Sequence, residues 1–129
     1  MWVALEDGGM TGNSGNGGTS QGIRVASVDD IPEGEGIAIS SDITGTEDDI
    51  AVFRDDSGTC WALNDTCTHE TASLAEGWVE DGDVECPLHS SRFNLKTGKV
   101  DGLPATRDTV PHRVEVRDGE VYLFPGERP

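Results

Sequence analysis

Short runs in which apolar and polar residues alternate occupy the chain from Ile23 onward. A strand turns successive side chains to opposite faces, so an apolar residue at every second position predicts a half-buried strand. Such runs cover residues 23–28, 36–40, 49–54, 59–63, 112–116 and 120–124. No window of a dozen residues shows helical periodicity. The pattern predicts an all-β domain of short strands joined by long polar loops.

Glycine-containing turns separate several of these runs. Asp118-Gly119 predicts a tight hairpin between the last two strands, and Asp81-Gly82 predicts another between residues 78–79 and 84–86. The sequence Asp55-Asp56-Ser57-Gly58 predicts the turn between residues 49–54 and 59–63. Residues 96–98 predict a further turn, between residues 93–95 and 99–100. Antiparallel pairing of neighbouring strands follows from these turns.

The first 22 residues differ in composition from the rest. They hold seven of the 17 glycines and almost no apolar side chain after Leu5. Such a segment buries too little apolar surface to offset its conformational entropy. We therefore predict a disordered glycine-rich tail over residues 1–22 and one folded domain over residues 23–126.

Charge and size narrow the possible functions of this domain. The chain has 129 residues, a net charge of −16 and 34% hydrophobic residues, so its core is expected to be thin. A surface this acidic repels nucleic acid and anionic membranes, and no apolar run approaches the length of a membrane span. The three cysteines are too few and odd in number for a disulfide scaffold, which indicates a reducing, cytoplasmic location.

Two short motifs each combine one cysteine with one histidine. They are Cys67-Thr68-His69 and Cys86-Pro87-Leu88-His89, with the predicted 78–85 hairpin between them. Side chains two apart in an extended segment point the same way, and Pro87 favours a turn that lets its neighbours converge. Two thiolates and two imidazoles around one point suit either a closed zinc site or an iron–sulfur cluster.

The way the ligands are shared between the loops favours the cluster. Zinc sites usually pair like ligands within one segment, whereas each loop here carries one cysteine and one histidine. This double motif, continued by Ser90-Ser91-Arg92-Phe93, resembles the Rieske family over roughly residues 23–124. The resemblance implies an antiparallel β-sandwich with a small cluster-binding subdomain, at about residues 65–103, formed by two ligand loops.

The resemblance also implies a division of the ligands within one [2Fe-2S] cluster per chain. Cys67 and Cys86 would hold one iron, and His69 and His89 the other. Two ferric ions, two sulfides and two thiolates sum to zero charge, whereas a cluster with four cysteines is already dianionic. An electron enters a neutral centre more easily, so a reduction potential of about −150 to +300 mV is expected.

Residues next to the ligands indicate which branch of the family the chain resembles. High-potential members carry a disulfide between the two loops, but Ala72 and Leu88 occupy those positions here. Phe93 replaces the tyrosine of those members, while Ser91 retains their serine and is expected to donate a hydrogen bond to a cluster sulfide. Leu103-Pro104 resembles the loop that covers the cluster. Ser91, Leu88 and Pro104 are thus the expected neighbours of the ligands.

These features resemble the soluble Rieske ferredoxins of bacterial ring-hydroxylating oxygenase systems. Such a protein is an electron carrier and not an enzyme in its own right. The resemblance implies a flavin-dependent NAD(P)H reductase as the electron donor and a terminal Rieske oxygenase as the acceptor, with the carrier a monomer. One alternative is the small subunit of an assimilatory NAD(P)H nitrite reductase, and another, from a different class, is a structural zinc-binding module.

Four further residues have simpler expected roles. Cys60 is expected to be a small buried apolar residue. His112 is expected in a strand near the surface. Trp61 and Trp78 are expected to pack in the core or to support loops.

Overall fold

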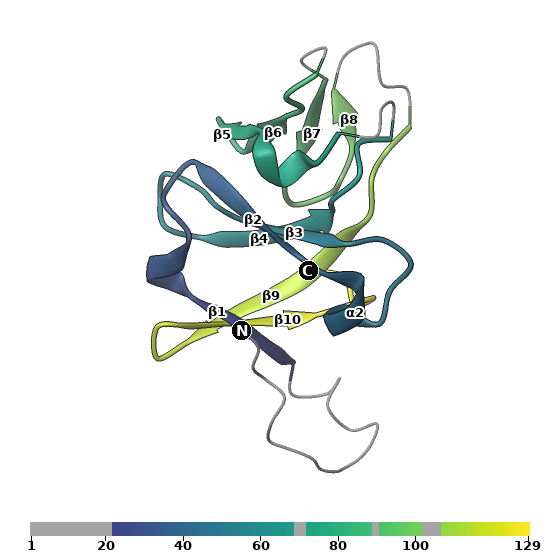
Figure 1. Ribbon diagram of the computed structural model, residues 1–129. Helices are drawn as coiled ribbons and strands as arrows, with labels where there is room; N and C mark the ends of the chain where they lie inside the picture. Colours follow the sequence, from purple (N-terminus) through teal and green to yellow (C-terminus); the bar gives the residue numbers. More distant parts are fainter. Residues whose placement is uncertain (1–21, 69–71, 89–90, 102–106) are drawn as a thin grey trace.

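The computed structural model describes residues 22–68, 72–88, 91–101 and 107–129, and they form two antiparallel sheets (Figure 1). The large sheet has six strands in the order β1-β10-β9-β4-β3-β2. The strands are β1 (Ile23–Ser27), β2 (Glu35–Ile39), β3 (Ile50–Arg54), β4 (Cys60–Asn64), β9 (Pro111–Arg117) and β10 (Glu120–Phe124). The predicted all-β, antiparallel fold is confirmed, as each of the six alternating runs matches one of these strands to within one residue at either end.

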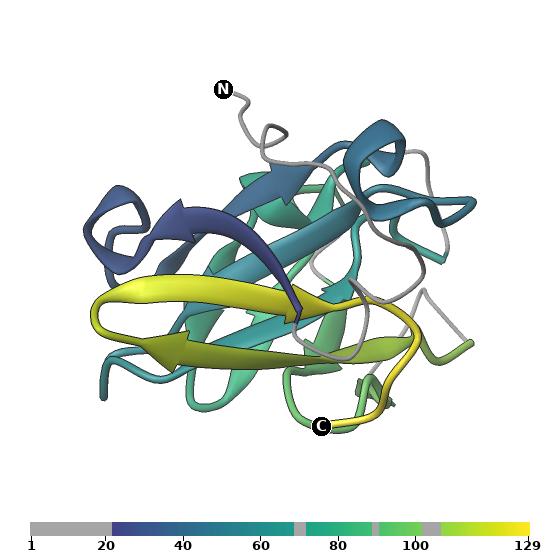
Figure 2. The same cartoon turned by 90° about the horizontal axis from the view of Figure 1, so that it is seen from below.

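The large sheet curls so that its two halves face each other as two layers. In Figure 2 the yellow hairpin of β9 and β10 lies in front of the teal strands β3 and β4. The join between the halves is short, because β4 and β9 pair through Ala62 with His112 and Leu63 with Pro111. The apolar side chains between the layers come mainly from β2, β3, β4 and β10: Ile39, Ile50, Val52, Cys60, Ala62, Val121 and Leu123.

The small sheet lies at one end of the curled sheet (Figure 1). Its order is β5-β6-β7-β8, with β5 (Trp78–Glu80), β6 (Asp83–Glu85), β7 (Arg92–Asn94) and β8 (Val100–Asp101). Inward-facing Val84 and Phe93 are fully buried and pack with Phe53 and Leu63 of the large sheet. A second apolar cluster therefore joins the two sheets.

The predicted Asp-Gly hairpins are confirmed. Asp81 and Gly82 have φ values of 55° and 82°, and Asp118 and Gly119 have φ values of 52° and 78°. Positive φ at both central residues gives a turn whose twist matches that of paired strands. These turns connect β5 to β6 and β9 to β10. The strands β5 and β6 pair along their whole lengths, and all of β10 pairs with residues 113–117 of β9.

Three short helical turns were not predicted. They are η1 (Val28–Asp30), α2 (Ser41–Thr44) and η2 (Leu74–Glu76). Each is too short for a periodic pattern, and α2 depends on local capping: the Ser40 hydroxyl accepts from the Asp42 amide, and Gly45 ends the turn with a φ of 74°. Within the described ranges, no helix has the length and apolar character needed to cross a bilayer.

Two side chains depart from their predicted environments. Trp78 is 49% exposed on β5, so its predicted place in the core is wrong and its loop-supporting role stays a prediction. Trp61 does pack against the apolar cluster between the sheets. Cys60 is buried as predicted, and burial raises the pKa of its thiol. His112 was predicted near the surface, but it is 4% exposed.

His112 is buried because its ring joins three segments at the seam between the halves of the large sheet. The Gly126 amide donates to Nδ1 over 2.9 Å, so Nδ1 carries no proton. Nε2 must then carry the proton, and it donates to Asn64 Oδ1 over 2.7 Å. Burial lowers the pKa of His112, although the Asp48 carboxylate partly opposes this shift. The fold thus selects the neutral ring.

This arrangement predicts that acid weakens the fold through His112. The unfolded ring binds a proton near pH 6.5 and the folded ring at lower pH, so stability falls as the pH drops below about 6.5, by up to ~1.4 kcal/mol per pH unit. His112→Asn keeps an acceptor at the Nδ1 position but does not titrate. Thermal denaturation should show the stability advantage of the wild type over H112N shrinking from pH 7.5 to pH 5.5. A constant difference would contradict the assignment.

Candidate metal centre

Cys67 and Cys86 lie together in the apolar cluster between the two sheets. Both are free thiols, 3% and 1% exposed, and they share this cluster with Leu74, Phe93 and Leu95. Cys67 follows the end of β4 and Cys86 follows the end of β6. Separate loops thus bring the two cysteines into one buried region, and their role as ligands stays a prediction. The predicted ligands His69 and His89, and Pro104, lie outside the described residues.

Hydrogen bonds at both ends of the first loop hold Cys67 in place. The Cys67 amide donates to the Ala72 carbonyl over 2.9 Å, and Thr66 and Ser73 form a bridge just outside this contact. The Asp65 carboxylate oxygen Oδ1 accepts from the Ser73 hydroxyl over 2.8 Å and from the Ala75 amide over 3.0 Å. Asp65 therefore fixes the return of the loop to the start of η2.

A second carboxylate ties this loop to the large sheet. Asp48, which precedes β3, accepts from the Thr66 amide over 3.0 Å and from the Thr66 hydroxyl over 2.7 Å. The Asp65 amide donates to the Asp49 carbonyl over 2.8 Å. Asp65 and Thr66, the two residues directly before Cys67, are thus held by the segment leading into β3.

The second loop closes as a hairpin between β6 and β7. The Cys86 amide donates to the Ser91 carbonyl over 2.7 Å, directly after the strand pair Glu85 and Arg92. Ser91 is 1% exposed, whereas Leu88 at the far end of the loop is 47% exposed. The predicted bond from the Ser91 hydroxyl to a sulfide, and any contact of Leu88 with a cluster, stay predictions.

Gly77 allows the two loop-bearing segments to approach closely. It links η2, which follows the first loop, to β5. A Cβ atom at this position would lie 1.9 Å from the Glu85 carbonyl oxygen, far inside contact distance. Because Glu85 immediately precedes Cys86, any larger residue at position 77 would displace the start of the second loop.

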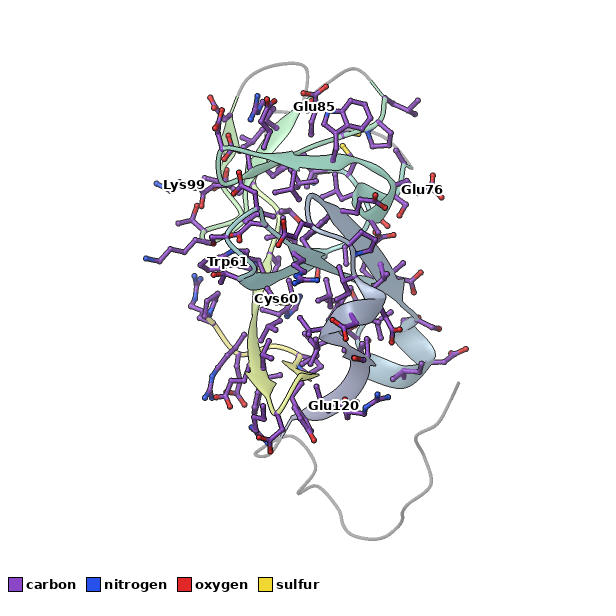
Figure 3. The ribbon with its side chains drawn as sticks, turned by 90° about the vertical axis from the view of Figure 1, so that its left-hand side faces the viewer. Cys60, Trp61, Glu76, Glu85, Lys99 and Glu120 are labelled. Carbon is purple, nitrogen blue, oxygen red and sulfur yellow. The ribbon has the colours of Figure 1, made fainter. Side chains whose placement is uncertain are left out.

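The outer face of the small sheet is acidic and carries one large apolar side chain. Directly paired residues lie on the same face of a sheet. One row on the outer face consists of Trp78, Glu85, Arg92 and Asp101, and the next row consists of Glu80, Asp83 and Asn94. The Arg92 guanidinium is occupied by its neighbours: it donates to the Glu80 carbonyl over 2.9 Å and lies 3.5 Å from an Asp83 carboxylate oxygen. Figure 3 shows Glu85 at this end of the molecule and Glu120 at the opposite end.

The chemistry of the described donors fits an iron–sulfur cluster. Two buried thiols in an apolar cluster can supply two thiolates, which soft metals prefer. Within the described ranges no group of three or more His, Cys, Asp and Glu residues is assembled for a metal ion.

Sequence reasoning missed Asp65 and Gly77. Asp65 was one acidic residue among 25 Asp and Glu residues, and its partners are eight and ten positions further along the chain. Burial raises the pKa of Asp65, although its hydrogen bonds from Ala75 and Ser73 act in the opposite direction. The sequence shows an aspartate just before a ligand motif but does not show that it is buried. This signal of a structural role can therefore be used only once the burial of Asp65 is known.

Comparison with known proteins gives a consistent result. The family model described as "Rieske [2Fe-2S] domain" matches residues 21–124. The 3-phenylpropionate/cinnamic acid dioxygenase ferredoxin subunit of Escherichia coli (strain K12) is 43% identical over 97 residues, which cover 74% of this chain and 86% of the relative.

Two solved structures resemble the described fold. A chain in the complex of reduced oxygenase and oxidised ferredoxin in carbazole 1,9a-dioxygenase has a TM-score of 0.68 and 35% identity, covering 78% of this chain and 99% of that one. The small subunit of a NADH-dependent nitrite reductase from Mycobacterium tuberculosis has a TM-score of 0.66 and 20% identity, covering 78% and 90%. The second similarity shows the fold alone.

The role of Asp65 predicts a contrast between two substitutions. Asp65→Asn keeps Oδ1 as an acceptor for both Ser73 and Ala75, whereas Asp65→Ala leaves the buried Ala75 amide without this partner, at a cost of about 1–3 kcal/mol. D65A should therefore release its bound metal to a chelator at least several-fold faster than the wild type, while D65N should stay close to it. Metal release followed by absorbance tests this, and equal rates for the two variants would contradict the role.

Proposed function

The chain belongs to the Rieske [2Fe-2S] family, and from this premise we propose that its two cysteine–histidine loops hold the cluster and that the small-sheet end docks to redox partners. The protein is a ferredoxin component of a ring-hydroxylating dioxygenase system. It carries electrons to the oxygenase component and is not itself catalytic. The family match also decides between the two metal alternatives in favour of the cluster over zinc.

The nitrite reductase alternative has weaker support. Its small subunit resembles this chain in fold at 20% identity, whereas the dioxygenase ferredoxin from Escherichia coli is 43% identical. The same fold serves several electron-transfer systems, so sequence identity is the better guide to the partner.

We assign the ligands by the double motif. Cys67 and Cys86 would hold one iron, and His69 and His89 the other. The bound cluster takes up and releases one electron at a time. The protein excludes water from the two thiolates by burying them, and it holds their loops through Asp65 and through the amide of Cys86. A fixed ligand geometry keeps reorganisation small when the charge of the site changes.

The partners beyond the oxygenase are inferred from charge and from the family. We propose a flavin-dependent NAD(P)H reductase as the electron donor. A net charge of −16 disfavours nucleic acid and anionic membranes and favours basic docking faces. Transient redox encounters of this kind suit a monomer, and three free cysteines suit the cytoplasm.

The exposed apolar residues near the second ligand loop indicate where docking occurs. Leu88 lies in that loop, and Trp78 pairs across the sheet with Glu85, the residue before Cys86. The acidic outer face surrounds Trp78, so a partner with basic residues around an apolar pocket is complementary to it. Aromatic side chains in such a setting often dominate binding energy.

The burial of two free thiols in one cluster is the observation that carries this function. Its test uses a third buried cysteine as a control. Cys67→Ser and Cys86→Ser should lose iron, sulfide and transfer of electrons to the terminal oxygenase, whereas Cys60→Ser should retain all three. Reduced protein mixed with oxidised oxygenase in a stopped-flow instrument should be reoxidised in the wild type and C60S. No transfer from fully loaded wild-type protein would contradict the proposed acceptor.

Docking through Trp78 predicts a separation between binding and redox properties. Trp78→Ala should raise the KM of electron transfer from this protein to the oxygenase by about tenfold, because anchor residues contribute on the order of 1–2 kcal/mol or more to binding. The same substitution should leave the reduction potential unchanged. Ile43→Ala is a matched control, because Ile43 is 52% exposed on α2, away from the small sheet (Figure 1). A KM for W78A equal to that of I43A would exclude this docking site.

A further inference from the structure

Arg107 and Thr68 are joined by two reciprocal hydrogen bonds. The Thr68 hydroxyl donates to the Arg107 carbonyl over 2.7 Å, and Arg107 Nη2 donates to the Thr68 carbonyl over 3.1 Å. Thr68 stands between the assigned ligands Cys67 and His69, and the two partners are 39 positions apart in the chain. The contact therefore links the first ligand loop to a segment that follows β8.

The segment that carries Arg107 is itself anchored to the small sheet. The Asp108 carboxylate oxygen Oδ1 accepts from the Val100 amide over 3.0 Å. The Thr109 amide donates to the Gly98 carbonyl over 2.8 Å. Gly98 has a φ of 75°, and a Cβ there would lie 2.3 Å from the Thr109 carbonyl oxygen, so the close approach requires glycine. Arg107 thus reaches Thr68 from a fixed base.

This contact restrains Thr68, a residue of the first ligand loop that does not bind the carboxylates of Asp48 and Asp65 in the described part of the chain. Asp48 accepts a hydrogen bond from Thr66, directly before the motif, and Asp65 accepts hydrogen bonds from Ser73 and Ala75, which follow it. Thr68 lies within the motif, and its hydroxyl and its carbonyl are both engaged by Arg107. A restraint on Thr68 acts directly on the backbone that joins the two ligands.

The contact also holds a positive charge close to the ligands. The chain has 9 Lys and Arg residues against 25 Asp and Glu residues, so its overall field opposes the addition of an electron. Reduction gives the cluster one negative charge, and a fixed guanidinium favours the more negative state. Arg92, the nearest cation along the second loop, is already engaged by Glu80 and Asp83.

We propose that Arg107 is a positioning residue that holds Thr68, between the assigned ligands Cys67 and His69, in place and raises the reduction potential of the centre. This inference rests on the proposed ligand assignment and deepens it. It separates two properties of the Arg107 side chain, because its hydrogen bond to the Thr68 carbonyl acts on cluster retention and its charge acts on the potential.

Four variants separate the two properties. Arg107→Gln removes the charge and the Nη2 hydrogen bond to the Thr68 carbonyl, whereas the bond from the Thr68 hydroxyl to the Arg107 main-chain carbonyl does not depend on the side chain at position 107. Arg107→Lys keeps the charge but not the guanidinium donor, and Thr68→Val removes the hydroxyl donor without altering charge or branching. Arg24→Gln is the control for net charge, because Arg24 pairs with Glu120, and Glu120 lies at the end of the molecule opposite Glu85 (Figure 3).

The measurements are the reduction potential by voltammetry and the rate of iron release to a chelator. R107Q should have a lower potential than R24Q, and R107K a potential close to that of the wild type. R107Q, R107K and T68V should each release iron several-fold to about tenfold faster than R24Q, as expected for the loss of one hydrogen bond in each variant. If R107Q keeps a wild-type circular dichroism spectrum but acquires no cluster, it is folded and has lost cluster retention completely. That result also supports the proposal.

Two results would overturn the inference. One is a potential for R107Q equal to that of R24Q, and the other is an unchanged release rate in all three variants of the contact. If wild-type protein itself holds no iron and sulfide, the ligand assignment fails instead. The iron content of the wild type therefore distinguishes failure of this inference from failure of the proposed function.

Discussion

Two thiols from separate loops must reach one buried region, and the small sheet is organised around that requirement. The loops are short and polar, so apolar burial of their own residues does not fold them. They are held instead by partners outside: Asp48 and Asp65 for the first loop, and the paired ends of β6 and β7 for the second. Because β4 ends at Asn64, directly before Asp65, the large sheet positions the first loop. The curled sheet is therefore the rigid base of the site.

The elements predicted well from the sequence are those whose signal is local. Asp118-Gly119 specifies a turn through its own conformational preferences, and the strands it joins alternate in polarity. His112, Trp78 and Asp65 were misjudged or missed because their environments come from residues distant in the chain. His112 is buried where it binds Asn64 and Gly126, and Trp78 is exposed because it lies on the outer face of the small sheet. A strand pattern alone does not say which face meets another sheet.

Charge has two different roles in this molecule. The acidic outer face of the small sheet suits brief encounters with basic partners, since electrostatic attraction speeds association without requiring a large interface. The same charge disfavours the reduced state of the neighbouring centre. The Arg107 contact places one cation at the ligand loop while leaving the outer face acidic. The charge of the outer face that attracts partners and the electrostatic potential at the cluster can thus differ in sign.

The central claim is that two inequivalent irons share one cluster, one held by Cys67 and Cys86 and the other by His69 and His89. Mössbauer spectroscopy of the oxidised protein tests it most directly, because nitrogen and sulfur ligation give different isomer shifts. We predict two quadrupole doublets of equal area, with the larger isomer shift belonging to the iron held by histidines. A single doublet typical of four sulfur ligands, or a preparation that holds zinc in place of iron, would contradict the account.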